Sequence, residues 1–221
     1  EQGVSEVLAE RFGFELVAER PLLVEWKAMA DRVDNVEEEI HIAMVGKYTG
    51  LSDSYLSVIK ALQHSSYAVN RKLVIDWIES ADLDDATAAS DSDAHARAWG
   101  LLRGADGILV PGGFGGRGIE GKIKAAEFAR ENLVPYLGVC LGLQVATIEF
   151  CRNVLGMEGA NSTEFDEDTP HPAVVFMPEI SKTHMGGTMR LGTKPTPFLV
   201  DDCKMRRLYG GADHVDERHR H

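Results

Sequence analysis

The chain has 221 residues, of which 44% are hydrophobic and 26% charged, a composition typical of a soluble globular domain or of one domain plus part of another. Its formal net charge of −12 argues against general nucleic-acid binding, and no apolar run reaches the roughly 18 residues that a membrane span needs. The three cysteines lack paired spacing, which disfavours a disulfide framework and a zinc cluster. We therefore expect no metal site and a cytoplasmic location.

The N-terminal stretch differs from the rest of the chain. Residues 1–40 carry 11 acidic and 4 basic residues, a net of −7, and apolar residues recur at helical spacing in residues 1–14. The run "DNVEEE" at 34–39 precedes the first core strand, so we place a domain boundary between residues 37 and 38. A helix-like beginning and an end without a closing element indicate a fragment of a longer chain, although a flexible tail would look similar.

From residue 40 onward, strand-like segments alternate with helical ones. Strands are predicted at 40–46, 72–78, 106–113 and 134–140, and helices at 52–66, 91–102, 119–131 and 141–156. Ser52 or Asp53 is expected to cap the first of these helices, and Asp91 or Ser92 the second. The strands are continuously apolar, as expected when helices cover both faces of a parallel sheet. The pattern predicts an α/β fold with a mostly parallel central sheet. Beyond residue 157, segments 173–179 and 186–192 are candidate strands of a different arrangement, with antiparallel pairing as one option.

Cys140 lies between Gly138 and Gly142, where a predicted strand meets a predicted helix. Strand, sharp turn and helix form a nucleophile elbow, in which side chains two positions before and after the nucleophile would collide. At a helix N-terminus the dipole and the free N–H groups favour a thiolate, and the N–H of Leu141 points to where an oxyanion would form. A cysteine that is simply buried also fits this short pattern.

The segment "VPGGFGGRG" at 110–118 follows another predicted strand. Its backbone N–H groups at Gly112 and Gly113 are able to approach a ligand closely, because glycine carries no side chain. This segment is a candidate second half of the oxyanion hole. A phosphate-binding loop is a less suitable interpretation, because the spacing and the lysine of that motif are absent. A flexible turn without a binding role is the alternative interpretation.

Several stretches together resemble the glutaminase domain of the CTP synthase family, a triad-type (class I) glutamine amidotransferase. They are "GKYTGLSDSYLSVIKAL", "PGGFGGRG", "GVCLGLQ", "NSTEFD", "GGTMRLG" and "ERHRH". The resemblance covers essentially the whole chain. It implies a three-layer, flavodoxin-like α/β fold, with residues 1–37 as the end of a synthetase domain and an inter-domain linker. Residues 38–221 are then an amidotransferase domain that is incomplete at its C-terminus.

The resemblance implies that glutamine is hydrolysed and that its ammonia aminates UTP to CTP in a synthetase domain. Cys140 is the implied nucleophile and forms a γ-glutamyl thioester, while the N–H groups of Gly113 and Leu141 bind the oxyanion. Three further residues are implied in substrate binding. They are Gln144 for the polar end of the substrate, Glu164 for its α-ammonium, and Arg220, with Arg218 as an alternative, for its α-carboxylate.

The resemblance also implies the partners. This domain needs no cofactor, whereas the synthetase domain uses ATP and Mg²⁺. The expected partners are L-glutamine, the synthetase domain of the same chain and, in the full-length family, further copies in a homotetramer, with neither nucleic acid nor a membrane. Residues in two segments are candidates for the face toward the synthetase domain. These are Phe114 and Arg117 in a lid, and Lys47, Tyr48 and Tyr55, the last of which fits a core position equally well.

One departure from the family pattern is clear. A triad needs a histidine base and an acid that orients it, and the "HPE"-like stretch that supplies them in the family is absent, so none of the eight histidines is carried over as the base. Two alternatives therefore stay open: an amidotransferase that serves another acceptor, and an inactive amidotransferase-like binding module.

Overall fold

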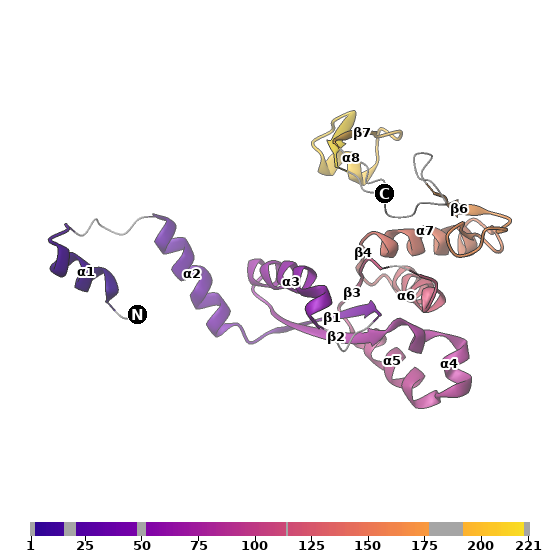
Figure 1. Ribbon diagram of the computed structural model, residues 1–221, viewed down its shortest axis with the longest axis horizontal. Coiled ribbons are helices and arrows are strands. Elements are labelled where there is room, and N and C mark those ends of the chain that lie inside the picture. The colour runs from indigo at the N-terminus through magenta and orange to yellow at the C-terminus, as the bar shows by residue number, and fades with distance from the viewer. Residues whose placement is uncertain (1–2, 16–20, 48–51, 114, 177–191, 219–221) are drawn as a thin grey trace. The chain divides into compact units, whose positions relative to one another are not determined.

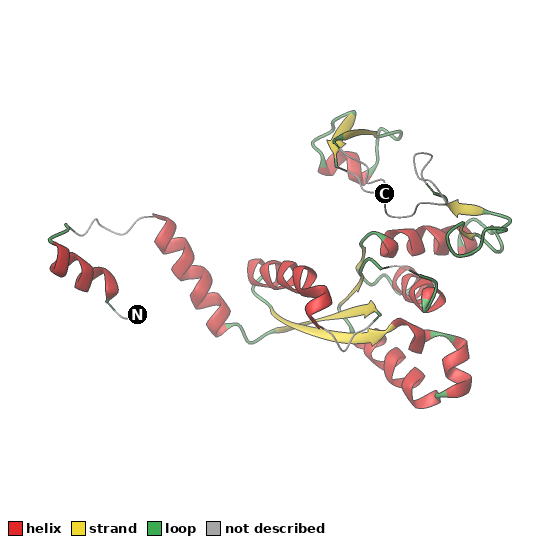
Figure 2. Cartoon of the chain, in the orientation of Figure 1, coloured by secondary structure: helices red, strands yellow, loops and turns green. Residues whose placement is uncertain are grey.

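The computed structural model describes residues 3–15, 21–47, 52–113, 115–176 and 192–218 (Figure 1). The chain divides into two compact units, residues 1–145 and 146–221, and each is treated by itself. Figure 2 shows that helices and strands alternate through most of the first unit.

The first unit is built around a four-stranded parallel sheet. Its strands are β1 (Glu39–Gly46), β2 (Lys72–Glu79), β3 (Gly107–Val110) and β4 (Tyr136–Gly138), in the spatial order β2-β1-β3-β4. All four residues of β3 are buried, as its continuously apolar sequence predicts. The α/β prediction with a parallel central sheet is confirmed.

The helices of this unit connect successive strands. They are α3 (Leu56–Ala68), α4 (Asp85–Ser90), α5 (Ser92–Gly104) and α6 (Ile119–Glu131). α1 (Val4–Phe12) and α2 (Pro21–Asn35) precede the first strand, and α7 (Leu141–Asn153) follows β4 and continues into the second unit. The chain moves one way across the sheet from β1 to β2 and the other way from β2 to β3 and β4. Right-handed crossovers therefore place α3 on one face and α5 with α6 on the other, which gives three layers (Figure 1).

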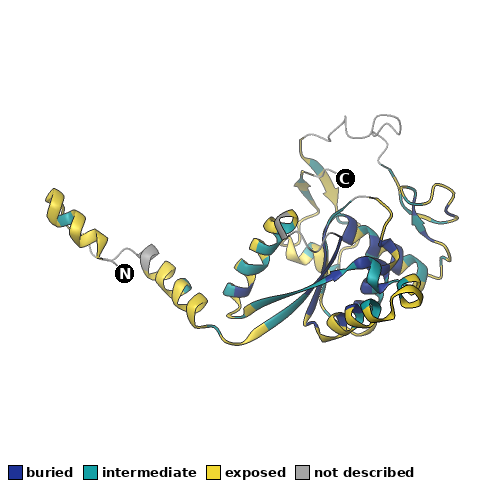
Figure 3. Ribbon diagram, turned by 60° about the horizontal axis from the view of Figure 1, so that its bottom comes forward, coloured by how far each residue is buried: buried dark blue, intermediate teal, exposed yellow. Residues whose placement is uncertain are grey.

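The core lies between the central strands and the helices that pack on them, where Figure 3 shows most of the buried residues. Its largest apolar members are Met44, Ile78, Leu83, Leu102 and Leu141. By contrast, α1 has no buried residue, which explains why its apolar stripe adds nothing to this core.

Several element boundaries differ from the predicted ones. The segment 52–55 is a 3₁₀-helix, η1 (Ser52–Tyr55), so α3 begins at Leu56 rather than behind a cap at Ser52 or Asp53. Asp91 caps α5 as predicted, since its carboxylate accepts from the N–H of Ala94 at 3.0 Å. A second 3₁₀-helix, η2 (Ser80–Leu83), and α4 were not predicted, because short Ala, Ser and Asp segments carry little periodicity.

The second unit contains two small sheets and a short helix. β5 (Asn161–Ser162) pairs with β6 (Pro172–Val174), β7 (Lys194–Pro197) pairs with β8 (His214–Glu217), and α8 (Lys204–Leu208) lies between β7 and β8 in the chain. The strand at 172–174 pairs parallel, so the antiparallel option was wrong for this segment. Antiparallel pairing occurs instead between β7 and β8. Most of the candidate strand at 186–192 lies outside the described residues.

Candidate active site

The candidate site lies at the carboxyl ends of the parallel strands. β1, β3 and β4 end at Gly46, Val110 and Gly138, and the residues that follow them are Lys47, the glycine-rich loop 111–118 and Cys140. The strand order reverses between β1 and β3. In open parallel sheets, ligands bind in the crevice at such a reversal point.

Cys140 has a left-handed backbone with φ of 56°. This conformation is strained for a residue with a side chain, and such strain is typical of functional turns. Hydrogen bonds hold it on both sides. The N–H of Val139 donates to the carbonyl of Val110 at 2.9 Å, and the carbonyl of Cys140 accepts from Leu143 and Gln144 at 3.1 and 3.2 Å. The turn is therefore a formed elbow between β4 and α7, with the thiol half-buried.

The two glycines that flank the elbow are sterically required. A Cβ at Gly138 would overlap the carbonyl group of Gly142, and a Cβ at Gly142 would overlap the carbonyl oxygen of Val110. The hydroxyl of Tyr136 also donates to the carbonyl of Gly142 at 2.7 Å. The collision that the sequence predicts at these positions is present, while the support from Tyr136 was missed because it depends on the folded turn.

The glycine-rich loop lies against the elbow. A Cβ at Gly112 would stand 3.3 Å from the Cβ and 3.6 Å from the Sγ of Cys140. A Cβ at Gly113 would stand 3.8 Å from the Cδ2 of Leu141. No hydrogen-bond acceptor for the N–H of Gly113 or of Leu141 is found within the described part of the chain. These two N–H groups belong to the two backbone segments that lie against each other at Cys140.

The remaining predicted substrate residues are divided between the two units. Gln144 is half-buried in the first turn of α7. Glu164 belongs to the second unit, where it is exposed and its N–H donates to the Oγ of Ser162 at 3.2 Å. Arg220 lies outside the described residues, and Arg218 is exposed after β8.

The described residues among those expected at an inter-domain face have partners within the first unit. The Nζ of Lys47 donates to the carbonyl of Gly115 at 2.8 Å, and its side chain is buried. The Tyr55 hydroxyl donates to the carbonyl of Lys47 at 2.6 Å, so Tyr55 supports the end of β1. Arg117 forms a 3.0 Å ion pair with Glu79 at the end of β2. Tyr48 and Phe114 lie outside the described residues.

Lys122 is the residue at this site that sequence reasoning missed. It is 1% exposed, and a Cβ at Gly113 would stand 3.9 Å from its Nζ. Burial, and then the neighbouring charge of Lys47, lowers the pKa of Lys122 to about 8. A signal was available, since Lys122 falls on the apolar stripe of α6 with Ile119 and Ile123.

The described histidines of the first unit do not complete a triad at the thiol. Among the described residues, His41 is the histidine that pairs with carboxylates, at 2.9 Å from Asp76 and 3.7 Å from Glu39. It lies near the amino end of β1, whereas Cys140 follows the carboxyl end of β4. His41 is therefore not a base for Cys140.

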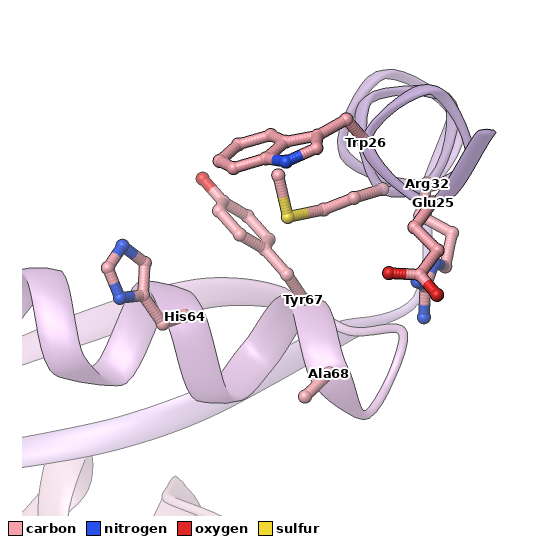
Figure 4. A pocket seen from close by; sticks show the side chains of 7 residues that line it. Glu25, Trp26, Arg32, His64, Tyr67 and Ala68 are labelled. Carbon is pink, nitrogen blue, oxygen red and sulfur yellow. The ribbon is translucent and has the colours of Figure 1, made fainter. Parts of the chain in front are cut away.

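A pocket of about 440 Å³ lies away from the elbow, between α2 and α3. Figure 4 shows Trp26 of α2 and Tyr67 of α3 facing each other across it, with Arg32 and Glu25 at one side. None of the predicted site residues lines it. The described residues also contain no group of three or more His, Cys, Asp or Glu side chains placed to hold a metal ion. In the same residues, no helix combines the length and apolarity needed to cross a bilayer.

Comparison with known proteins identifies the family. Residues 50–221 match the family model described as "Glutamine amidotransferase class-I". The chain is 54% identical over 222 residues to human CTP synthase 1, covering 100% of this chain and 38% of the relative. It is 55% identical over 207 residues to a Dictyostelium discoideum CTP synthase, covering 90% of this chain and 36% of that one. The chain thus spans less than two fifths of the length of these curated relatives.

A solved structure agrees with this match. The glutaminase domain of Trypanosoma brucei CTPS, with bound acivicin, superimposes with a TM-score of 0.68 at 40% identity. The superposition covers 82% of this chain and 66% of the other. Together with the formed elbow and the glycine loop beside it, these similarities show that the chain belongs to the class I glutamine amidotransferase family.

Proposed function

We propose that this chain is the glutaminase portion of a CTP synthase, an enzyme that hydrolyses glutamine to supply ammonia for the conversion of UTP to CTP, and that the base of its catalytic triad lies outside residues 1–221. The observation that carries the proposal is the strained cysteine at 140, held between two required glycines with the N–H groups of Gly113 and Leu141 beside it. The similarity to CTP synthases over the full length of the chain supports this acceptor over another one.

In the proposed reaction, the Sγ of Cys140 attacks the γ-carbonyl carbon of glutamine. The carbonyl oxygen becomes an oxyanion, which accepts hydrogen bonds from Gly113 and Leu141. The C–N bond then breaks, the amide nitrogen leaves as ammonia after gaining a proton, and a γ-glutamyl thioester remains on Cys140. Water attacks the thioester, which releases glutamate and restores the thiol. The proton carrier is not assigned to a described residue.

Substrate selectivity is assigned to three further side chains. Gln144, one turn into α7, is proposed to hold the polar end of glutamine through its amide. Glu164 is proposed to pair with the α-ammonium group and Arg220 with the α-carboxylate, because opposite charges and a bidentate guanidinium suit these groups. These roles rest on the resemblance of "GVCLGLQ", "NSTEFD" and "ERHRH" to the family.

We assign the remaining steps to other parts of a longer protein. Residues 1–37 are proposed as the end of the synthetase domain and a linker, since the first core strand starts at Glu39. ATP and Mg²⁺ act in the synthetase domain, and no cofactor is assigned to the glutamine site. A homotetramer and a cytoplasmic location follow from the family resemblance, and the three free cysteines agree with a reducing setting.

The test is selective labelling of the 221-residue chain with a chloroketone analogue of glutamine, followed by intact-mass measurement and peptide mapping. We expect one addition, at Cys140, which leaves Cys151 and Cys203 unmodified and is blocked by L-glutamine. The Cys140→Ala variant should take up no label. Equal labelling of the three cysteines, or labelling that glutamine does not slow, would contradict the proposal and favour an inactive module.

A further inference from the structure

The strongest unexplained feature near the site is a buried lysine on α6. Lys122 is among the largest fully buried side chains, and it lies on the helical stripe that also buries Ile119, Ile123 and Ala126. A buried ammonium is costly compared with an apolar side chain of similar size. Because Lys122 is kept where an apolar residue would fill the same space, its charge calls for an explanation.

The lysine lies beneath the loop that faces the thiol. A Cβ placed at Gly113 would stand 3.9 Å from the Nζ of Lys122, and a Cβ placed at Gly112 would stand 3.6 Å from the Sγ of Cys140. One short backbone segment thus separates the ammonium from the thiol. This same segment carries the N–H that we assign to the oxyanion.

The charges that face Lys122 leave the surroundings positive. Lys47, from the end of β1, is 7% exposed and raises the local positive potential, while Glu79, from the end of β2, opposes it. The carboxylate of Glu79 also binds Arg117 at 3.0 Å. No ion pair of the described residues includes Lys122.

The other charged groups near the start of α6 belong to a separate cluster. Asp84 interacts with Glu120 and Lys124, and Lys124 forms an ion pair with Asp85. Lys124 therefore provides a matched control, since it is a lysine of the same helix whose charge is directed to carboxylates and not to the glycine loop.

We propose that Lys122 is a positioning residue of this site, whose buried ammonium holds the Gly112–Gly113 segment and supplies the positive potential in which the Cys140 thiolate and the oxyanion form. A fixed positive charge in a water-poor site stabilises developing negative charge without reorganisation. The oxyanion part of this inference rests on the proposed function. The thiolate part is independent of glutamine.

The inference predicts a pH dependence with a definite sign. Because the pKa of Lys122 is lowered to about 8, its ammonium is present at pH 7 and lost as the pH rises through 8. The support for negative charge on Cys140 then weakens in alkaline solution. A residue that only fills space would affect the reactivity of the thiol by the same factor at every pH.

The experiment measures the alkylation rate of Cys140 by iodoacetamide, a neutral probe that needs no glutamine site, from pH 6 to 10 on the 221-residue chain. We expect Lys122→Met to react more slowly at pH 7 by about 3- to 10-fold, the effect of one unit charge acting through a partly buried path. The ionisation of the thiol itself raises both rates with pH, so the readout is the ratio of the wild-type rate to the Lys122→Met rate, which should fall as the pH passes through 8. Lys124→Met should follow the wild type throughout.

A second variant covers the case in which Lys122→Met does not fold. Lys47→Met removes the like charge beside Lys122, so Lys122 stays charged to higher pH and the ratio of the Lys47→Met alkylation rate to the wild-type rate should rise above pH 8. Equal rates of wild type and folded Lys122→Met at every pH, or a Lys47→Met ratio that does not change with pH, would overturn the inference. Failure of glutamine to block the chloroketone would contradict the proposed function alone, because the iodoacetamide profile does not depend on it.

Discussion

At the scale of single residues, the site depends on glycines, which carry no side chain. The left-handed backbone of Cys140 costs on the order of 1–3 kcal/mol. Hydrogen bonds from Val139, Leu143 and Gln144 around the turn offset that cost. Gly112 has a different role from Gly138 and Gly142. Its missing side chain leaves space beside the thiol, whereas the two elbow glycines allow the turn itself to form.

Substitution of Gly112 tests this role. In Gly112→Ala, the new methyl group would stand 3.3 Å from the Cβ of Cys140, tight enough to shift the thiol or the loop by a few tenths of an ångström. We expect labelling of Cys140 by the glutamine-analogue chloroketone to slow by about 10-fold or more, because small misplacements are costly for attack geometry. The measurement is the labelling rate by mass spectrometry, with thermal melting to confirm folding.

Gly116→Ala is the matched control for this substitution. A Cβ at Gly116 meets no atom within 4 Å, although it belongs to the same loop. It should label at the wild-type rate. If both alanines slow the reaction equally, loop flexibility rather than space beside the thiol explains the effect.

At the scale of elements, the position of α6 brings Lys122 under the loop. α6 follows Gly118, which has a φ of 70°. It packs closely against η2 at Gly121, where a Cβ would overlap the backbone of Ser80. The buried residues on α6 then face the central strands. The close contact between α6 and η2 therefore decides which α6 side chain reaches the candidate site.

Gly121→Ala should disrupt this contact. The added Cβ would overlap the carbonyl oxygen of Ser80. This oxygen belongs to the backbone, so it does not move aside as the end of a flexible side chain would. We expect a loss of roughly 2–4 kcal/mol in the free energy of unfolding, in the range of severe packing clashes. Urea denaturation followed by circular dichroism measures it.

Gly100→Ala, within α5, provides the opposite expectation. A Cβ there meets nothing within 4 Å, and alanine is favoured over glycine in a helix by about 0.5–1 kcal/mol. This variant should be more stable than the wild type. Equal stability of the two variants would show that the approach of α6 to η2 is not needed.

At the scale of the whole molecule, the N-terminal segment is largely separate from the core of the first unit. α1 buries no residue, and Trp26 of α2 is 59% exposed where it lines the pocket against α3. The first residue of β1 that pairs in the central sheet is Glu39. The boundary between residues 37 and 38 stays a prediction.

Removal of residues 1–37 tests that boundary. We expect the remaining chain to unfold cooperatively, with a melting temperature within about 3 °C of the wild type, because less than roughly 1 kcal/mol of packing is lost. Differential scanning calorimetry of both chains provides the comparison. A broad transition, or a drop well beyond this range, would place α2 inside the folded domain.

The sequence by itself determined the features that depend on neighbouring residues. Alternating strands and helices, the cap at Asp91, and the requirement for glycine at 138 and 142 all follow from periodicity and local sterics. The family resemblance belongs here as well, since its motifs are short and contiguous. Short elements such as η2 and α4 were missed because few residues carry their signal.

Only the tertiary structure decided which distant residues meet at the thiol. The approach of Gly112 to Cys140, the bond from Tyr136 to Gly142 and the burial of Lys122 under Gly113 each join parts of different elements. The physical reason is that such contacts depend on strand order and on how closely α6 packs. Local propensity specifies neither of these.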